Sequence, residues 1–352
     1  MKLLLHAFDL PLRHAFTISR GSYRVQPTLI VQLDEDGLSG FGEATTNPYY
    51  GVTLEGMASA LHAVAPLLAA RRLDDPADLW DELRPCLQAH PFAQCALDQA
   101  AHDLWGQQQG QRVHRLWGLS DEQLPPSSYT IGIDRIDVMV ARLREFPGWP
   151  VYKIKLGTPH DVAIVQALRR HTEAVFRVDA NGAWSPREAL DNARALEPLN
   201  VEFIEQPLPA DQWPAMRELV GRSPLPLIAD ESCQTESDVE RCHGCFQGVN
   251  IKAVKCGGLT PARRMIARAR QLGMRTMIGC MTESSVGISA VAQLLPLVDY
   301  ADLDGAVLLA EDIAEGVTLE RGRCRFAPRP GTGARLRRPA PFAGGSPSPG
   351  QE

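Results

Sequence analysis

A short apolar segment followed by an amphipathic stretch recurs eight times between Ser127 and residue 305. The apolar segments cover residues 127–133, 152–157, 176–182, 201–207, 226–232, 248–255, 275–281 and 299–305. Alternation of strands with helices favours a parallel sheet, because a strand reaches its parallel neighbour through a crossover helix. Eight units of nearly constant length in one continuous stretch predict an α/β fold of one kind, the (β/α)8 barrel of the TIM type.

A doubly wound open sheet is the alternative fold for alternating strands and helices. It ordinarily has fewer strands and a glycine-rich phosphate-binding turn, and the sequence has no such turn. Helix start signals support the repeat, because residues 185–188 (SPRE) form a capping box with proline at the first helical position. Thr260-Pro261 is expected to open a later helix in the same way.

The segments on either side of the repeat have a different pattern. Residues 1–120 predict an α+β capping domain, with a hairpin around Asp36-Gly37 and helices over 54–73 and 95–109. We expect the barrel over residues 121–310. Residues 311–338 are expected to return as a hairpin (GVTLERGRCRF) that packs on the capping domain and completes it, and 339–352, rich in Pro, Gly and Ser, to form a disordered tail.

Charge and hydropathy narrow the classes of partner. The formal net charge is −6, and no run of Lys and Arg of the kind that follows a phosphate backbone is present, so nucleic acid is not the expected partner. No apolar stretch approaches the roughly 18 residues of a membrane span, and the opening MKLLLHAFDL lacks the pattern of a signal peptide. We expect a cytoplasmic protein, without a membrane partner, that acts on a small molecule.

The eight cysteines are dispersed along the chain, which favours reduced thiols over a disulfide framework. Cys242-His243-Gly244-Cys245 has the spacing of a redox motif or of half a zinc site. A second pair of ligands at zinc spacing is missing, so coincidence is the favoured interpretation of this motif.

Each predicted strand ends on a polar residue, and consecutive ones are 24 to 26 positions apart. These residues are Thr130, Lys155, Asp179, Glu205, Asp230, Lys255, Cys280 and Asp304. One strand–helix unit separates each from the next, so all eight are expected to meet at the rim where active sites of this fold are built.

Three consecutive strands carry carboxylates, Asp179, Glu205 and Asp230. Three such groups facing one point repel one another unless a cation lies among them, and a set of oxygen ligands without His or Cys suits Mg²⁺. The alternative is that each carboxylate caps a helix or pairs with a neighbouring lysine. Three on adjacent strands favour one Mg²⁺ site.

Lysines on either side of these carboxylates predict an acid/base pair, Lys155 and Lys255. Lys153 has the same strand parity as Lys155, so both are expected to point into the barrel mouth and Lys153 to add positive charge there. Lys252 is out of parity with Lys255, and its expected role is a structural pairing with a carboxylate.

The motifs KIKLG, DANGAW, EQPLP, ADES and NIKAVKCGG, in this order, resemble the enolase superfamily, and the two lysines resemble its muconate-lactonizing subgroup. The resemblance covers about residues 1–335. It implies a Mg²⁺-assisted removal of a proton next to a carboxylate by a lysine, with stabilisation of an enediolate. Members similar to mandelate racemase carry a catalytic His late in the barrel, where this chain has Cys280.

At the eighth strand, Asp302 and Asp304 lie two positions apart, so both side chains are expected on the strand face that points into the site. They are expected to lie too far round the barrel from Asp179, Glu205 and Asp230 to bind the same metal ion. They therefore require a cationic partner, unless they only cap a helix. This Asp-x-Asp is similar to the mark of the dipeptide epimerases, in which the pair holds the substrate's α-ammonium group. AFTISRGS, ADESCQT, VNIKAVKCGGLT and IGCMTESS extend the resemblance to epimerases of alanine–glutamate dipeptides.

The resemblance implies a 1,1-proton transfer at the α-carbon of the second residue of an L-Ala-L-Glu-like dipeptide, with a role in murein peptide metabolism. Thr130 is expected to hydrogen-bond the substrate and Lys153 to stabilise the enediolate. The capping domain is expected to close the mouth through residues 17–24 and 48–51, where Arg20, Arg24 and Tyr50 would read the second residue. A homo-oligomer is also implied.

Two other functions remain open at this point. One is another enzyme of the same subgroup: o-succinylbenzoate synthase, N-acylamino acid racemase or muconate cycloisomerase. The substrates of these enzymes have no free ammonium group, which leaves Asp302 and Asp304 with nothing to bind. The other is a non-catalytic, metal-dependent binding barrel, which the retention of every charged position disfavours.

Overall fold

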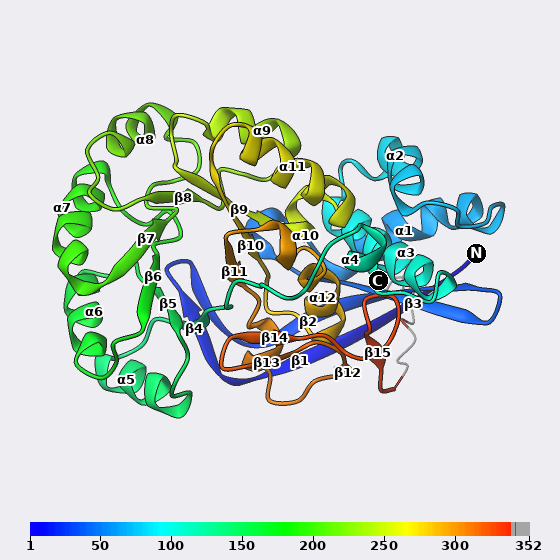
Figure 1. Ribbon diagram of the computed structural model, residues 1–352, viewed down its shortest axis with the longest axis horizontal. Coiled ribbons are helices and arrows are strands. Elements are labelled where there is room, and N and C mark those ends of the chain that lie inside the picture. Colours follow the sequence, from blue (N-terminus) through cyan, green and yellow to red (C-terminus); the bar gives the residue numbers. More distant parts are fainter. Residues whose placement is uncertain (339–341, 343–352) are drawn as a thin grey trace, which may run out of the picture.

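The computed structural model of the chain describes residues 1–338 and Phe342 (Figure 1). Its two parts are a ring of parallel strands with helices outside and an antiparallel sheet with helices of its own. The disorder expected for residues 339–352 lies, apart from Phe342, outside the described residues.

The barrel prediction is confirmed. Eight parallel strands follow one another in the order of the sequence, and a bridge between Ser127 and Ala301 joins the two edge strands. The strands are β4 (Tyr129–Ile131), β5 (Val151–Lys155), β6 (Val175–Asp179), β7 (Val201–Glu205), β8 (Leu227–Ala229), β9 (Gly248–Lys252), β10 (Arg275–Gly279) and β11 (Tyr300–Asp302). One prediction within this set is wrong: the strand expected over 248–255 ends at Lys252, and a single helical turn follows it.

Helices cover the outside of the barrel strands, as Figure 1 shows for the arc from α5 to α9. They are α5 (Ile136–Glu145), α6 (Asp161–Arg169), α7 (Pro186–Leu196), α8 (Trp213–Val220), α9 (Glu236–Cys242), α11 (Leu259–Gln271) and α12 (Ser285–Ala292), with short 3-10 turns η2 (Glu197–Leu199), η3 (Leu295–Leu297) and η4 (Gly305–Leu308). The single turn α10 (Ala253–Cys256) follows β9 directly and contacts α3 (Pro91–Gln108) of the first part of the chain. The capping box predicted at the start of α7 is present, because the backbone N of Ser185 donates to Glu188 and the backbone N of Glu188 to the hydroxyl of Ser185.

The first part of the chain forms a three-stranded antiparallel sheet with helices on one side. Its elements are β1 (Lys2–Ile18), β2 (Gly21–Glu35), β3 (Leu38–Thr45), η1 (Pro48–Tyr50), α1 (Leu54–Ala69), α2 (Pro76–Leu87), α3 (Pro91–Gln108) and α4 (Val113–Leu116). The predicted hairpin is confirmed: Glu35 pairs with Leu38, and Asp36 and Gly37 both have positive φ, as a tight two-residue turn requires.

Two glycines let the sheet approach α3 closely. A Cβ on Gly40 would lie 2.2 Å from the backbone oxygen of Ala100, and one on Gly42 would lie 2.0 Å from that of Ala96. No side chain fits at such distances, so the sequence GFG marks the face of β3 that packs on a helix.

The C-terminal segment contains β12 (Ala314–Glu315), β13 (Thr318–Glu320), β14 (Arg323–Arg325) and β15 (Arg335–Leu336). It contacts both parts of the molecule. The backbone N of Ser127, next to β4, donates to the oxygen of Gly322 at 2.8 Å, and the backbone N of Thr332 donates to Asp103 of α3 at 2.6 Å.

The β1–β2 hairpin reaches from the capping sheet to the mouth of the barrel (Figure 1). The backbone N of Ile133, just after β4, donates to the oxygen of Thr17 at 2.8 Å. On the other side, the hydroxyls of Tyr23 and Thr282 lie 3.0 Å apart. The hairpin therefore lies over the carboxyl ends of the barrel strands.

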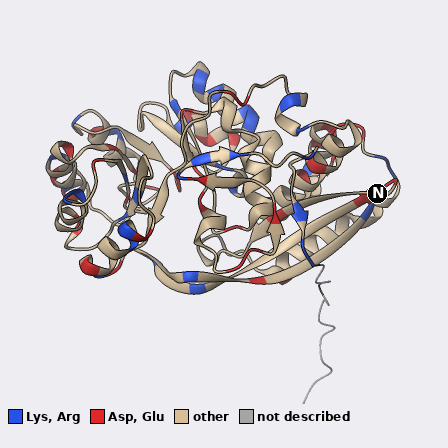
Figure 2. Ribbon diagram, turned by 60° about the horizontal axis from the view of Figure 1, so that its bottom comes forward, with Lys and Arg blue, Asp and Glu red and all other residues tan. Residues whose placement is uncertain are grey.

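Figure 2 shows basic and acidic residues interspersed along the ribbon, so the described part of the chain has no segment that carries charges of one sign alone. No helix among the residues that the structure describes is long and apolar enough to cross a membrane.

Candidate active site

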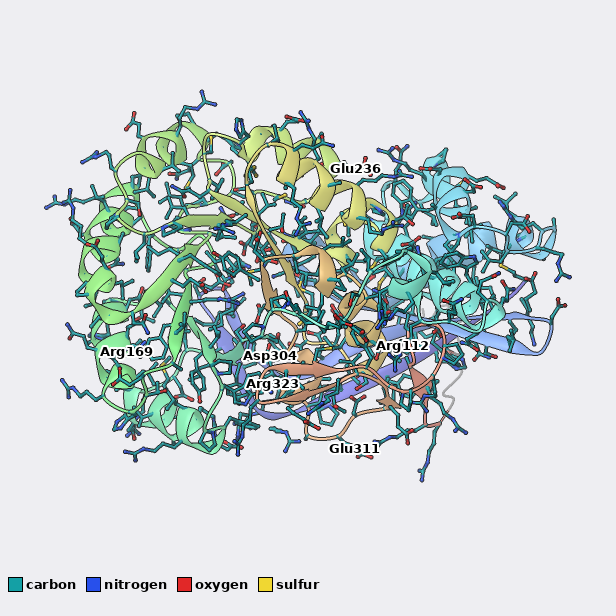
Figure 3. The ribbon with its side chains drawn as sticks, in the orientation of Figure 1. Arg112, Arg169, Glu236, Asp304, Glu311 and Arg323 are labelled. Carbon is teal, nitrogen blue, oxygen red and sulfur yellow. The ribbon has the colours of Figure 1, made fainter. Side chains whose placement is uncertain are left out.

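A cavity of about 390 Å³ lies between the hairpin and the carboxyl ends of the barrel strands. The capping sheet and its 3-10 turn contribute Arg20, Tyr23, Tyr49 and Tyr50 to its wall, and the barrel contributes Thr130, Lys153, Lys155, Asn181, Asp230, Glu231, Lys252, Cys280, Asp302 and Asp304. In Figure 3, Asp304 is labelled near the middle of the molecule, whereas Glu236 and Glu311 lie near its outer edge.

Three carboxylates converge at the carboxyl ends of neighbouring strands, as predicted. Asp179 ends β6, Glu205 ends β7 and Asp230 follows β8 directly. All three are buried, and one oxygen from each lies within 4.8 Å of the others. This is the one such group of potential metal ligands within the described part of the chain.

The electrostatics of these acids fit a cation. Burial and the neighbouring charge of Asp179 raise the pKa of Glu205 to about 7. Burial alone would also raise the pKa of Asp179, but the ammonium groups of Lys155 and Lys153 outweigh it and lower the pKa to about 2. Asp179 and Asp230 each pair with two lysines, whereas Glu205 pairs with Lys153 alone among the described residues, and a divalent ion with oxygen ligands would add positive charge beside it. The residues therefore fit Mg²⁺.

Lys153 is the buried cation that joins two acidic groups. Its Nζ lies 2.8 Å from Glu205 Oε2, 3.2 Å from Asp179 Oδ2 and 2.7 Å from Asp302 Oδ2. Burial lowers the pKa of Lys153, but these carboxylates, with Asp302 first, outweigh it and raise the pKa well above its usual value. Lys153 therefore stays charged.

Lys155 and Lys252 line the cavity. Lys155 donates to Asp179 Oδ2 at 2.6 Å, and Lys252 donates to Asp230 Oδ2 at 2.8 Å. Burial lowers the pKa of Lys252, but the charge of Asp230 outweighs it and raises the pKa.

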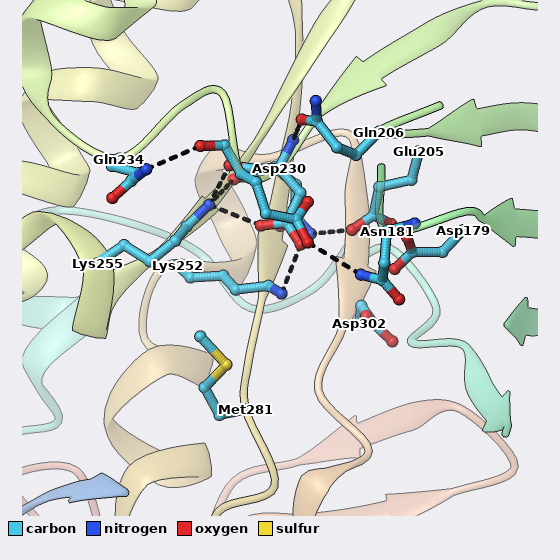
Figure 4. Close-up of polar contacts among 12 residues, drawn as sticks. Asp179, Asn181, Glu205, Gln206, Asp230, Gln234, Lys252, Lys255, Met281 and Asp302 are labelled. Atoms are coloured by element: carbon cyan, nitrogen blue, oxygen red, sulfur yellow. Dashed lines mark hydrogen bonds and ion pairs between the residues drawn. The ribbon is translucent and has the colours of Figure 1, made fainter. Parts of the chain in front are cut away.

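The expectation that Lys255 faces the substrate rested on a strand that continues through residue 255, and the structure corrects it. Lys255 lies on the one-turn helix α10, is absent from the cavity wall and donates to Asp230 Oδ1 at 2.6 Å and to the backbone oxygen of Asp230. Figure 4 shows Lys252 and Lys255 reaching Asp230 from different directions. Lys252, expected to be structural, is the lysine of this side that meets the cavity.

Asp302 and Asp304 both line the cavity near Thr130. Asp302 accepts from Ser128 Oγ at 2.7 Å as well as pairing with Lys153. Asp304 accepts from the backbone N and the hydroxyl of Thr130, at 2.5 and 3.2 Å, and its side chain does not cap η4, which it precedes.

The charge of Asp304 is not compensated. Burial, followed by the charge of Asp302, raises the pKa of Asp304 to about 7. Among the described residues, no cationic side chain forms an ion pair with Asp304, whereas Asp302 has Lys153. The position of Asp304 in the cavity wall is therefore suited to a cationic group of a ligand.

The three expected specificity residues differ in position. Arg20 lines the cavity and spans to the barrel, where its Nη2 donates to Glu231 Oε1 at 2.6 Å. Tyr50 lines the cavity and packs against Phe92 with ring centroids 5.7 Å apart. Arg24 is exposed and does not contribute to the wall, so the expectation that it reads the substrate is not supported by its position.

Sequence reasoning assigned no individual role to Asn181, Glu231, Tyr23 and Tyr49, all in the cavity wall, although the two tyrosines lie in the segments expected to close the mouth. Asn181 and Glu231 lie within two residues of the predicted metal ligands, in DANG and ADES, which is the one signal that could have identified them. Cys242 and Cys245 are buried and, like the other cysteines, free, and no zinc cluster forms around them among the described residues.

Two family profiles match the chain. Residues 4–118 match the family described as "Mandelate racemase / muconate lactonizing enzyme, N-terminal domain", and residues 137–340 match "Enolase C-terminal domain-like".

Relatives and solved structures agree with these matches. The chain is 51% identical to an L-Ala-D/L-amino acid epimerase of Flavobacterium johnsoniae, over 96% of this chain and 100% of that one. It superposes with a TM-score of 0.90 on a substrate-liganded complex of the L-Ala-D/L-Glu epimerase from Bacillus subtilis, at 26% identity over 95% and 99% of the two chains. A dipeptide epimerase from Methylococcus capsulatus complexed with Mg and L-Arg-D-Lys gives a TM-score of 0.88 at 35% identity, over 95% and 99%.

Proposed function

The chain belongs to the mandelate racemase/muconate lactonizing enzyme family of the enolase superfamily, and from this membership and its site we propose that it is a Mg²⁺-dependent dipeptide epimerase. It is an isomerase that inverts the α-carbon of the second residue of a dipeptide such as L-Ala-L-Glu. The observation that carries the dipeptide assignment is Asp304, a buried carboxylate in the cavity wall with no cationic side chain beside it in the described part of the chain.

Lys155 and Lys252 are the proposed acid/base pair. Their strands, β5 and β9, are four positions apart in a barrel of eight, so the two lysines enter the cavity from opposite sides. One lysine, as a neutral amine, takes the α-proton, and the electron pair of the C–H bond moves into the adjacent carboxylate group. The opposite lysine, as an ammonium, returns a proton to the other face, which inverts the carbon.

The metal site supports this transfer. Asp179, Glu205 and Asp230 would hold Mg²⁺, which would supply positive charge to the substrate carboxylate and would compete with the lysines that now pair with two of these acids. Lys153, buried and charged between Glu205 and Asp302, adds positive charge on the same side of the cavity. A general base contributes roughly 10²–10⁴ in rate, so most of the lowering of the barrier has to come from these charges.

Asp302 and Asp304 would bind the α-ammonium group of the first residue. Because Lys153 already compensates Asp302, the ammonium group supplies the second cation that a pair of buried aspartates requires. This separates dipeptide epimerisation from the other reactions of the subgroup, whose substrates bring no free ammonium group.

Exchange of the α-proton in D₂O tests the proposal. The Mg²⁺-loaded enzyme is mixed with a panel of L-Ala-L-Xaa dipeptides, including L-Ala-L-Glu, and the α-protons are followed by NMR. The expected result is deuterium at the second residue together with the appearance of the D-epimer. Absence of exchange from the whole panel would remove the proposal, and exchange from N-acylated amino acids but not from dipeptides would favour the racemase of the same subgroup.

Two further parts of the proposal concern the setting of the enzyme. We propose a homo-oligomer, which light scattering of the purified protein tests by mass. We also propose a reducing, cytoplasmic compartment, which is supported by the eight free cysteines. Fractionation of the source cells tests the compartment.

A further inference from the structure

We propose that Asn181 is a positioning residue that links closure of the β1–β2 hairpin to the placement of the Lys155 ammonium group. The link is a hydrogen-bonded path through Arg20, Glu231 and Asn181 to Lys155. This inference rests on the proposed function, in which Lys155 serves one face of the substrate.

The path is continuous from the capping sheet to the barrel. Arg20 donates through Nη2 to Glu231 Oε1 at 2.6 Å and through Nη1 to the backbone oxygen of Asn181 at 2.8 Å. Asn181 Nδ2 donates to the same Glu231 Oε1 at 3.1 Å, and Lys155 Nζ donates to Asn181 Oδ1 at 3.3 Å. Arg20 also packs on Tyr49 of η1, whose ring centre lies 4.2 Å from the guanidinium carbon.

The amide of Asn181 satisfies both of its neighbours. A carboxylate such as Glu231 accepts and an ammonium group such as Lys155 donates, so the side chain between them must offer one donor and one acceptor. This requirement fixes the orientation of the amide, with Nδ2 toward Glu231 and Oδ1 toward Lys155. An aspartate at this position would place two carboxylates against each other.

The backbone holds Asn181 in place. Its φ is +47°, in the left-handed region that Asn and Gly adopt more readily than other residues, and its backbone N donates to Asp179 Oδ1 at 2.9 Å. The backbone of Asn181 is therefore held between Glu231 and Lys155, and only rotation of the side chain lets the amide respond to either neighbour.

Glu231 makes the path sensitive to closure. Its side chain is 3% exposed, and Arg20 is its one ion-pair partner within the described residues. When the hairpin withdraws, Glu231 loses this ion pair, and Asn181 Nδ2 is left as the one side-chain donor to Glu231 among the described residues, so the hydrogen bonding of the Asn181 amide must change with closure. Lys155 has one other hydrogen-bond partner among the described residues, Asp179, a proposed metal ligand. Asn181 is thus the partner that holds Lys155 when the metal competes for Asp179.

Asn181→Gly tests the inference. Glycine keeps the left-handed backbone and the contact from Arg20 to the oxygen of residue 181, and it removes only the amide. The readout is the rate of α-proton exchange in D₂O under single-turnover conditions, measured separately from the L,L- and the L,D-dipeptide. Lys155→Met identifies the epimer that Lys155 serves, because exchange from that epimer is lost.

We expect Asn181→Gly to slow exchange from the epimer served by Lys155 about three- to tenfold more than exchange from the other, the range for one hydrogen bond. Arg20→Met is expected to change the ratio of the two rates in the same direction, and Arg20→Lys to restore it. The double variant is expected to lose no more than the larger single effect, because both substitutions interrupt one path.

Asn200→Gly is the matched control, because Asn200 also has a left-handed backbone (φ +54°) but is exposed and follows η2 at the far end of the barrel. It should leave both rates unchanged. If Asn181→Gly does not fold, Asn181→Asp keeps the acceptor for Lys155 but removes the donor to Glu231, so Arg20→Met should no longer change the ratio in this background. An undiminished effect of Arg20→Met there would overturn the inference.

Equal loss from both epimers, or effects of Arg20→Met and Asn181→Gly that multiply in the double variant, would overturn the inference and leave the proposed function intact. Absence of exchange in the unaltered enzyme would overturn both.

Discussion

The ammonium group of Lys153 lies 2.7 Å from Asp302 and also contacts two of the three proposed metal ligands. One buried cation therefore joins the part of the cavity that would hold Mg²⁺ to the part that would hold the ammonium group of a dipeptide. Strand parity places Lys153 beside Lys155 at the end of β5, and the two side chains have different proposed roles: Lys155 would act on the substrate, and Lys153 compensates the buried acids.

Replacement of Lys153 tests this division. We expect Lys153→Met to destabilise the Mg²⁺-free protein strongly, by about 3–5 kcal/mol, because several buried carboxylates lose a shared partner. Thermal unfolding in EDTA and in Mg²⁺ measures the effect, and Mg²⁺ should recover part of the loss. Unchanged unfolding in EDTA would mean that these acids do not depend on Lys153.

Asp304→Asn should weaken recognition of the dipeptide. The variant keeps the size of the side chain but loses the charge that faces the ammonium group, and one hydrogen bond between charged groups corresponds to roughly a 10- to 150-fold loss in kcat/KM. An N-acetyl dipeptide lacks the ammonium group and is the control substrate, for which the substitution should cost nothing. Equal losses for both substrates would assign Asp304 a structural role.

The pH dependence of substrate capture should report Asp304. Because its pKa is raised to about 7 by burial and by Asp302, it is protonated in the free enzyme below that pH and must lose the proton to bind an ammonium group. We expect kcat/KM to fall tenfold per pH unit below about pH 7. In Asp304→Asn this decrease of kcat/KM with falling pH should be absent. A wild-type profile that is flat from pH 5 to 7 would contradict this assignment.

Glu283 predicts how stability depends on pH. Burial and the nearby charge of Glu43 raise the pKa of Glu283 to about 8, from an ordinary value of 4.5, and Gly287 leaves the room that these two side chains occupy. Between pH 4.5 and 8 the folded state holds a proton that the unfolded state releases, so stability must fall as the pH rises through this window.

Glu283→Gln removes this titration and is expected to unfold at a higher temperature than the wild type at pH 9 and at a similar temperature at pH 5. Scans of the Mg²⁺-free proteins at several pH values measure the difference. Parallel curves for the two proteins would show that Glu283 does not contribute.

The barrel and the acidic triad could be predicted from the sequence because both follow from spacing. A nearly constant interval of 24 to 26 residues places Asp179, Glu205 and Asp230 at the carboxyl ends of adjacent strands. This placement does not depend on the details of the helices between them. The hairpin at Asp36-Gly37 was predictable for a similar reason, since two residues with positive φ form a local signal.

Lys255 shows where spacing misleads. The constant interval between strand ends selected Lys255, but the alternation of apolar and polar residues in 248–252 breaks at Ala253-Val254, where the chain turns into α10. The long strand β1 was also missed, because its register shifts between Pro11 and Phe16 and interrupts the alternation.

The contact between Arg20 and Glu231 could not have been predicted. The two residues are 211 positions apart, and their approach depends on how the capping sheet sits on the barrel. The same placement leaves Arg24 in solvent although it lies four residues from Arg20 on the same hairpin.

The most direct test of the account is the exchange of the α-proton in D₂O by Lys155→Met, Lys252→Met and Lys255→Met, starting from each epimer of one dipeptide. We expect Lys155→Met to abolish exchange from one epimer and Lys252→Met from the other, because their strands lie on opposite sides of the cavity, while Lys255→Met retains exchange from both. Two results would contradict the assignment of Lys155 and Lys252 as the two opposed bases. One is an equal loss of exchange from both epimers in the first two variants, and the other is a loss of exchange from one epimer in Lys255→Met.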